Sequence, residues 1–232
     1  MKAWTCGRIF NQLVKAKIPG KSSLLRLIVH LGALIPISLL LYDYRIDNLT
    51  ANPIQEITFR TGKTTLVMLC LTLACSPIYS FLKYRPALNM RRTLGLYTFF
   101  YVSLHFLTFV VLDYGLNLGL IYEAIFEKPY ALVGFSAFLI LLPMAVTSTK
   151  GWQRRLGKNW KRLHRWIYAA GGLAVVHYSW AVKSDIREPI AYGIVVALLL
   201  LLRVPRVKKA THALFDRMRT GQPPALARVA TK

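Results

Sequence analysis

The residues of this chain best suited to chemistry are His105, His164 and His177, because each lies within or at the edge of a long apolar segment. An ionisable side chain inside a lipid bilayer is costly, so its presence there indicates a functional site. Imidazole is also a common axial ligand by which proteins hold haem iron. The three histidines therefore predict a haem-binding membrane protein that carries electrons.

His105 and His177 are expected to form one ligand pair. His105 lies eleven residues into the apolar segment that begins at Leu94, and His177 lies thirteen residues after His164, where another apolar segment begins. If both segments are helices that run in the same direction, the two side chains differ in depth by only about 3 Å. Two imidazoles at equal depth can bind one haem iron from opposite faces. The alternative is two unrelated histidines that are hydrogen-bonded to helix backbones.

His164 is expected to belong to a different ligand pair. It lies thirteen residues before His177, which places it about 20 Å lower along the helix and about 140° away around its axis. That distance suits a second haem, but the angle turns His164 away from the segment that carries His105. His30, about six residues into the first apolar segment, has a similar predicted depth. We therefore expect His164 and His30 to hold any inner haem; a lone polar role for His30 is an equal alternative.

Six apolar segments must position these histidines. Most are long enough, at about 20 residues, to cross a bilayer as a helix, and the last is near the lower limit. The segments cover approximately residues 24–42, 64–82, 94–112, 130–147, 165–182 and 190–204. The sequence thus predicts an all-α, polytopic membrane protein with six transmembrane helices. We expect a basic tail over 1–23, a six-helix domain over 24–204, and a second basic, partly disordered tail over 205–232.

The placement of charge predicts the orientation of these helices. The net charge is +22, and 25 of the 31 Lys and Arg residues lie in 1–26, 83–92, 149–165 and 203–232. Eight of the nine acidic residues lie in 43–63, 113–128 and 183–189. The two sets alternate along the chain, as the two sides of a six-span protein must, and the positive-inside rule puts both termini in the cytoplasm. Because topology accounts for the basic charge, no nucleic-acid partner is expected.

Four basic residues near the predicted cytoplasmic side are candidate ligands for an anionic cofactor. They are Arg91, Arg92, Lys158 and Arg162. Basic side chains form strong hydrogen bonds with carboxylates and phosphates, so these residues could bind haem propionates or a flavin phosphate. The alternative is that they only follow the topology rule and contact anionic membrane lipids.

Several motifs along the chain form a specific combination. They are Asn52–Gly62, Arg91–Leu96 with Leu104–Thr108, Lys128–Tyr130 with Gly134, Thr147–Ser148, and Arg155–Arg165 continuing to His177 and Tyr178. Together they resemble the MsrQ (YedZ) family, the haem-binding membrane subunits of bacterial periplasmic methionine-sulfoxide reductase systems. The resemblance covers nearly the whole chain from about Leu24 to Leu202.

The resemblance implies a six-helix, ferric-reductase-like transmembrane domain in the inner membrane of a Gram-negative bacterium. It implies one or two b-type haems, with ligands at His105, His164 and His177, and it allows flavin mononucleotide (FMN). Electrons would come from the quinol pool or a cytoplasmic flavin reductase and pass to MsrP, a periplasmic molybdopterin-containing reductase. The chain would then transfer electrons without acting on the final substrate. Phe59 departs from the family, which often has a histidine at that position.

A small transporter and a purely structural membrane subunit are the alternative functions. Pro36 and Pro143 could break helices near the membrane midplane, as in many transporters, but no internal repeat is visible. The six apolar segments also lack the carboxylates that are usual in proton-coupled transport. For a structural subunit the histidines would be incidental, so haem content distinguishes both alternatives from an electron carrier.

Overall fold

The computed structural model describes residues 21–182, 185–207 and 209–211, and every regular element within these ranges is a helix. The elements are α2 (Lys21–Arg45), α3 (Pro53–Leu82), α4 (Arg85–Leu107), the π-helix η1 (Thr108–Asp113), α5 (Leu118–Glu127), α6 (Pro129–Val146), α7 (Lys150–Leu156), α8 (Lys158–Leu163), the 3-10 turn η2 (His164–Trp166), α9 (Ile167–Ala181) and α10 (Arg187–Leu201). The all-α prediction is confirmed for this part of the chain. Most of each predicted tail lies outside the described residues.

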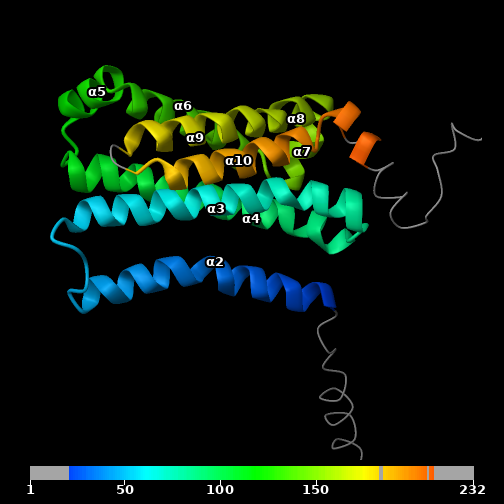
Figure 1. The fold of residues 1–232 in the computed structure, drawn as a ribbon, viewed down its shortest axis with the longest axis horizontal. Coiled ribbons are helices and arrows are strands. Elements are labelled where there is room, and N and C mark those ends of the chain that lie inside the picture. The colour runs from blue at the N-terminus through cyan, green and yellow to red at the C-terminus, as the bar shows by residue number, and fades with distance from the viewer. Residues whose placement is uncertain (1–20, 183–184, 208, 212–232) are drawn as a thin grey trace, which may run out of the picture.

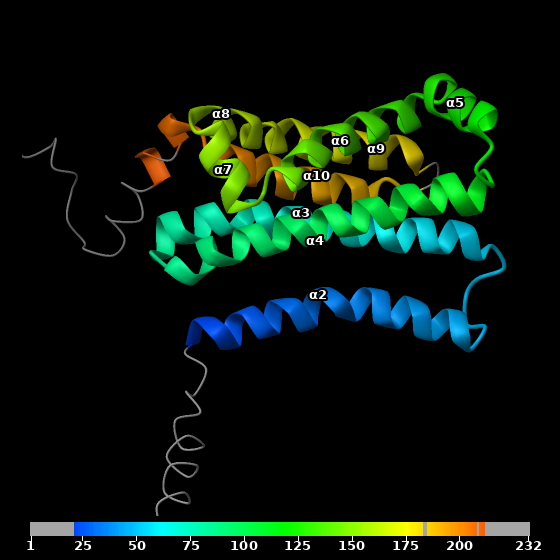
Figure 2. The same ribbon diagram turned by 180° about the vertical axis from the view of Figure 1, so that it is seen from behind.

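The long helices lie side by side and reverse direction at the two ends of a bundle (Figure 1). The closest pairs are α3 with α4 and α6 with α9, and α10 packs against both α9 and α3. Helix α2 packs on α4 and α3, on the side of this pair that faces away from α6 and α9 (Figure 2). The α3–α4 turn, α7 and α8 lie at one end, which we call the basic end; α5 and the α2–α3 loop lie at the other, the acidic end.

The helices begin where the sequence supplies caps for their free backbone N–H groups. The Asn52 side chain accepts a hydrogen bond from the backbone N–H of Gln55, and Pro53 occupies the first helical position of α3. The Asn117 side chain accepts hydrogen bonds from two N–H groups of α5. Thr149 caps α7 in the same way. These caps set the boundaries of the helices at both ends of the bundle.

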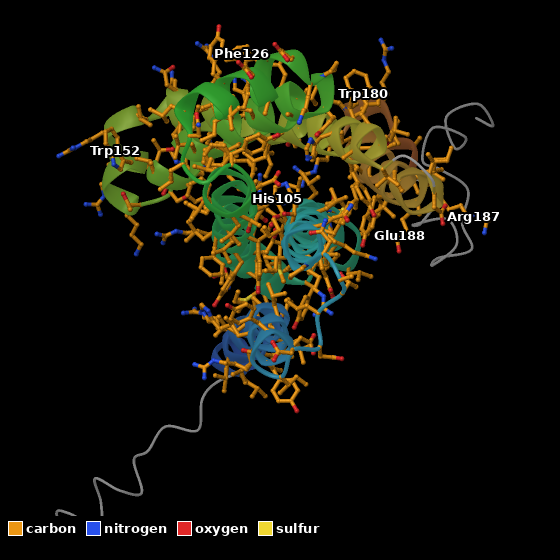
Figure 3. The ribbon with its side chains drawn as sticks, turned by 90° about the vertical axis from the view of Figure 1, so that its left-hand side faces the viewer. His105, Phe126, Trp152, Trp180, Arg187 and Glu188 are labelled. Atoms are coloured by element: carbon orange, nitrogen blue, oxygen red, sulfur yellow. The ribbon has the colours of Figure 1, made fainter. Side chains whose placement is uncertain are left out.

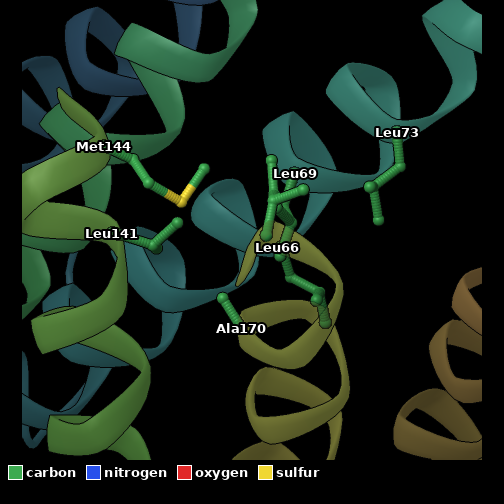
Figure 4. Close-up of a cluster of buried hydrophobic side chains, with 7 residues drawn as sticks. Leu66, Leu69, Leu73, Leu141, Met144 and Ala170 are labelled. Atoms are coloured by element: carbon green, nitrogen blue, oxygen red, sulfur yellow. The ribbon is translucent and has the colours of Figure 1, made fainter. Parts of the chain in front are cut away.

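A cluster of buried apolar side chains holds α6 and α9 against α3 (Figure 4). The α3 members are Leu66, Leu69 and Leu73, and the cluster is completed by Leu141, Met144, Ile167 and Ala170 from α6 and α9. Ala170 and Leu73 are fully buried, so this cluster excludes solvent from the space between α3 and α9. This contact fixes how the α6–α9 pair faces the α3–α4 pair, and so positions the histidines that these helices carry.

A proline break in α2 is repaired by a side chain of α4. Pro36 lies inside α2, and an internal proline opens the hydrogen-bond ladder of the preceding turn. The Tyr101 hydroxyl enters this opening, donating to the carbonyl of Ala33 at 2.6 Å and accepting from the N–H of Ile37 at 3.3 Å. Tyr101 is almost completely buried, so this contact ties α2 to α4 in an environment with little water.

The described helices account for four or five membrane spans, and the predicted six are not confirmed. Four helical segments are long and apolar enough to cross a membrane: Leu24–Arg45, Pro53–Leu82, Arg85–Asp113 and Pro129–Val146. There is a fifth span if Arg187–Leu201 and Pro205–Thr211, which are bent relative to each other, are counted as one. The remaining expected span, 165–182, is present as α9, which has only 15 residues. Its helix is shortened because the chain forms a 3-10 turn at His164–Trp166 before it continues as α9.

Candidate functional site

His105 of α4 and His177 of α9 face one another inside the bundle. Their ring centroids are 5.9 Å apart and their planes are nearly perpendicular, at 83°. Figure 3, an end-on view, places His105 between the α3–α4 pair and the helices above it. The structure thus brings together the two histidines that the sequence analysis paired by depth.

Each of these rings is held through its Nδ1 atom by a backbone carbonyl of the neighbouring helix. Nδ1 of His105 is 2.9 Å from the carbonyl oxygen of Thr58 in α3, and Nδ1 of His177 is 2.7 Å from that of Tyr130 in α6. A carbonyl oxygen can only accept, so both Nδ1 atoms donate and both Nε2 atoms of the neutral rings keep a free lone pair. A hydrogen bond of this kind is how proteins orient histidines that bind metals. The sequence analysis treated backbone hydrogen bonding of these histidines as an alternative to metal binding. The two are compatible here, because Nδ1 binds the backbone while Nε2 stays available to a metal.

Two glycines provide the space in which the rings sit. A Cβ atom added to Gly134 would lie 2.5 Å from Nδ1 of His177, closer than any real side chain allows. A Cβ atom added to Gly62 would lie 3.1 Å from Nδ1 and Cε1 of His105. The rings therefore pack directly on the backbones of α6 and α3, and glycine is required at position 134 by this close approach.

The two half-sites are built in the same way. In each, the accepting carbonyl and the glycine are four residues apart on one helix, Thr58 with Gly62 and Tyr130 with Gly134. In each, the histidine follows the carbonyl residue by 47 positions. The sequence analysis found no internal repeat because these few shared positions have no surrounding sequence similarity. The sequence analysis also assigned no role to Gly62 and Gly134. Their position four residues after Thr58 and Tyr130, whose carbonyls accept from the histidines, was the sequence feature that could have indicated one.

The histidine pair borders an apolar cavity of about 670 Å³. This volume is within the usual range for sites that bind cofactors, about 300–1,000 Å³. One wall consists of Phe106 and Phe109 of α4 and η1 with Phe135 and Phe138 of α6, and Phe106 stacks on Phe138 with ring centroids 4.8 Å apart. Flat aromatic walls and two free imidazole nitrogens fit a planar metal-bearing group such as haem, whereas a hydrated ion would find few polar ligands there.

A polar rim closes the cavity at the acidic end. Lys63 donates to both carboxylate oxygens of Glu188 at 2.8 and 2.9 Å, and the Tyr178 hydroxyl donates to the same carboxylate at 2.8 Å. A second hollow of about 540 Å³ lies outside this rim and shares Gln55, Phe59, Lys63 and Tyr178 with the cavity. Phe59, at which the sequence departs from the family, therefore stands between the cavity and the acidic end of the bundle.

Another aromatic–basic contact lies beyond the same end of the cavity. The ammonium group of Lys128 donates to the Tyr114 hydroxyl at 2.8 Å, which joins the segment after η1 to the start of α6. This hydrogen bond raises the pKa of Lys128. Lys128 therefore carries a positive charge at neutral pH, and it does not line the cavity.

His164 and His30 have separate surroundings. The His164 ring stacks on Trp160 with centroids 4.0 Å apart, and its Nδ1 donates to the Trp160 carbonyl at 3.1 Å. His30 lies on α2, with Nδ1 2.8 Å from the Tyr97 hydroxyl of α4. Because α2 and α8 lie on opposite sides of the α3–α4 pair (Figures 1 and 2), the structure does not bring His30 to His164. The angular offset was calculated for one continuous helix, whereas the structure places His164 in the 3-10 turn η2 and His177 in α9.

The four basic residues suggested as cofactor ligands lie on α4 and α8 at the basic end and differ in exposure. Arg91 is half-buried on α4, whereas Arg92, Lys158 and Arg162 are exposed. Arg203, which donates hydrogen bonds to the Tyr168 hydroxyl and the Leu73 carbonyl, was counted in the sequence analysis only as one basic residue of the segment 203–232.

Comparisons with known proteins agree with this architecture. The family model for the ferric reductase like transmembrane component matches residues 33–175, which include His105 and His164. Among similar proteins, the "Protein-methionine-sulfoxide reductase heme-binding subunit MsrQ" of Xanthomonas euvesicatoria pv. vesicatoria (strain 85-10) is 44% identical over 87% of this chain and 94% of its own. The proteins of the same name from Xanthomonas campestris pv. campestris (strain B100) and Herminiimonas arsenicoxydans are 47% and 41% identical, over 76% and 80% of this chain and 84% and 87% of their own.

No solved structure matches the chain. The family match covers more than half of the sequence, and the relatives are similar over most of their own lengths. This protein is therefore a multi-pass membrane protein that belongs to the ferric reductase-like transmembrane component family and, within it, to the MsrQ family.

Proposed function

We propose that this protein is a transmembrane electron carrier in which His105 and His177 hold one b-type haem. The observation that carries the proposal is the pair of facing imidazoles whose Nδ1 atoms both donate to backbone carbonyls. Each ring is left with a free Nε2 at the border of an apolar cavity lined by phenylalanines. The name of the similar proteins, a heme-binding subunit, supports the same assignment.

The residues around the cavity have distinct tasks in this proposal. A bound haem would supply one-electron chemistry at its iron. The carbonyls of Thr58 and Tyr130 fix the orientation of the rings and make their Nε2 atoms better donors to a metal. The four phenylalanines keep water away, and burial of this kind is one way in which proteins set the potential of haem iron.

We further propose six membrane spans with both termini in the cytoplasm of a bacterial cell and the chain in its inner membrane. The alternation of basic and acidic segments supports this topology, since their described parts lie at opposite ends of the bundle. Helix α9 would cross together with the helical turns before it, which begin at Lys158. The His105–His177 pair then belongs to the periplasmic half, close to the acidic end.

The proposed electron path runs from the basic end to the acidic end. Quinol or a cytoplasmic flavin reductase would donate, and a periplasmic molybdopterin-containing MsrP would accept electrons for the reduction of methionine sulfoxide. The name of the similar proteins, which places them in a methionine-sulfoxide reductase, supports such a partner. FMN is not part of the proposal, because three of the four predicted basic ligands are exposed.

For an inner haem the proposal keeps His164 as a candidate ligand and omits His30. His164 is half-buried at the basic end of the bundle, where its ring stacks on Trp160. His30 is exposed and is already hydrogen-bonded to Tyr97. Two haems would divide the crossing into shorter electron transfers than a single outer haem.

A reduced-minus-oxidised absorbance spectrum with haem quantified per chain tests the proposal. The protein should show a b-type spectrum, and either His105→Ala or His177→Ala should abolish or strongly reduce the outer haem signal. His164→Ala should remove signal only if an inner haem exists, and His30→Ala, the matched control, should retain all haem. A folded protein without haem, or full haem in His105→Ala and His177→Ala, would refute the proposal and favour the transporter or structural alternative.

A further inference from the structure

The cavity beside the histidine pair is polar toward one end and apolar toward the other. Toward the middle of the bundle it is lined by Leu66, Leu69 and Leu141, which belong to the buried apolar cluster between α3 and α6. Toward the acidic end it is lined by Asn52 and Gln55, at the start of α3. A ligand that fills this cavity is therefore amphiphilic, with its polar groups directed to the acidic end.

A b-type haem is a ligand of this kind. Its porphyrin ring is flat and apolar, and both of its propionate carboxylates are attached along one edge. A carboxylate placed among leucine side chains is costly unless it is paired with a cation or accepts hydrogen bonds. The lining of the cavity therefore directs the propionate edge away from the leucines and toward the acidic end, where it needs a basic partner.

Of the described residues that line the cavity, Lys63 is the only lysine or arginine. It directly follows Gly62, on which the His105 ring packs, so it lies on the same turn of α3 as the histidine contact. The carboxylate of Asp113, which also lines the cavity, would repel a propionate. Lys63 is therefore the basic group that the cavity offers to a carboxylate.

The ammonium group of Lys63 can take a second carboxylate without leaving its first. An ammonium group has three N–H donors, and Lys63 donates to the two carboxylate oxygens of Glu188, at 2.8 and 2.9 Å. No other partner of this group is found in the described part of the chain, so one donor remains available. The Lys63 side chain is 49% exposed and lines both the cavity and the outer hollow, so it is accessible from the haem side.

We propose that Lys63 binds a propionate of the haem held by His105 and His177, and so turns the propionate edge toward the acidic end. The inference rests on the proposed function, because it names a partner for a group of that haem. Lys63 acts as a positioning residue: it binds the side chain of the porphyrin and does not touch the iron. A charge-assisted hydrogen bond of this kind is about twice as strong as a neutral one.

The rate of haem loss from the full-length, haem-loaded protein in neutral detergent tests this contact, with excess apomyoglobin as the haem acceptor. The variants are Lys63→Met and Lys63→Arg. Lys128→Met is the matched control, because it removes the same charge at the same end from a residue that does not line the cavity. Glu188→Gln breaks the same ion pair as Lys63→Met but leaves the ammonium group in place.

A chemical change to the haem completes the test. The protein is produced in cells that cannot make haem and is then loaded either with haem or with haem dimethyl ester, whose esterified propionates carry no charge. The ester keeps the iron and the porphyrin ring, so the histidine ligands are unaffected by the change.

We expect about tenfold faster haem loss from Lys63→Met, and rates close to that of the parent protein from Lys63→Arg and Lys128→Met. With the dimethyl ester, Lys63→Met and the parent should lose the cofactor at the same rate. The proposal is wrong if Lys63→Met loses haem no faster than the parent, if Glu188→Gln has as large an effect, or if the difference persists with the ester. If Lys63→Met does not fold, the parent decides alone, since it should lose the ester at least about tenfold faster than haem.

Failure of this inference is distinguishable from failure of the proposed function. A protein that binds no haem refutes both, whereas a normal b-type spectrum with a rate of haem loss that is insensitive to Lys63 refutes only the propionate contact. Thermal unfolding of the haem-free protein, which should be the same for Lys63→Met and the parent, checks that the bundle is intact.

Discussion

Replacing Gly134 with alanine should remove the outer haem while leaving the helix bundle folded. The added Cβ would lie 2.5 Å from Nδ1 and 2.7 Å from Cε1 of His177. Because uncrowded contacts between such atoms are about 3.5 Å, the imidazole must move by about 1 Å. That movement stretches the 2.7 Å hydrogen bond to the Tyr130 carbonyl and turns Nε2 away from His105.

The expected size of the effect follows from these contacts. Overpacking of a filled site costs about 1–3 kcal/mol, and loss of a hydrogen bond that orients a ligand typically weakens metal binding by about 10–100-fold. Alanine is at the same time a better helix former than glycine by about 1 kcal/mol, so α6 itself should remain helical. We therefore expect at least tenfold weaker haem binding with little change in helix content.

The assay is haem retention per chain after purification, measured from the absorbance spectrum, with helix content measured by circular dichroism. Two other glycines provide a graded control. Gly62→Ala, whose Cβ would lie 3.1 Å from the His105 ring, should show a smaller loss, and Gly172→Ala, with no atom within 4 Å, should show none. The reasoning is refuted if Gly134→Ala retains full haem with an unchanged spectrum, or if Gly172→Ala loses as much haem.

Three further predictions concern the elements around this site. Tyr101→Phe removes the hydroxyl that repairs the proline break in α2, so the thermal midpoint in detergent should fall, with a loss of about 1–3 kcal/mol, while haem content stays constant; an unchanged midpoint would contradict that role. Lys63→Met breaks the ion pair with Glu188, which is solvent-exposed, so no measurable change in unfolding midpoint is expected at physiological salt; a large drop would show that the pair is structural. Asn117→Ala removes two cap hydrogen bonds of α5 and should increase backbone hydrogen exchange there, but not in α6.

The sequence alone determined what lies along each helix. Apolar segments and alternating charge predicted an all-helical membrane protein, because the cost of burying backbone groups in lipid leaves few other solutions. The constant rise of a helix turned residue numbers into depths, and this placed His105 and His177 at one level before any contact was known. The motifs around these residues also indicated the family correctly.

Only the tertiary structure decided which surfaces meet around those helices. Depth along an axis follows from sequence spacing, whereas neighbours in the plane of the membrane depend on the order and rotation of the helices, which are set by side-chain packing between them. For this reason the similar predicted depth of His30 and His164 did not reveal their separation by the α3–α4 pair. For the same reason, the close packing of His177 on Gly134 became visible only once distant segments were packed together. The hydrogen bond from Arg203 to the Leu73 carbonyl, which Pro77 leaves without an intrahelical donor, is a second contact of this kind.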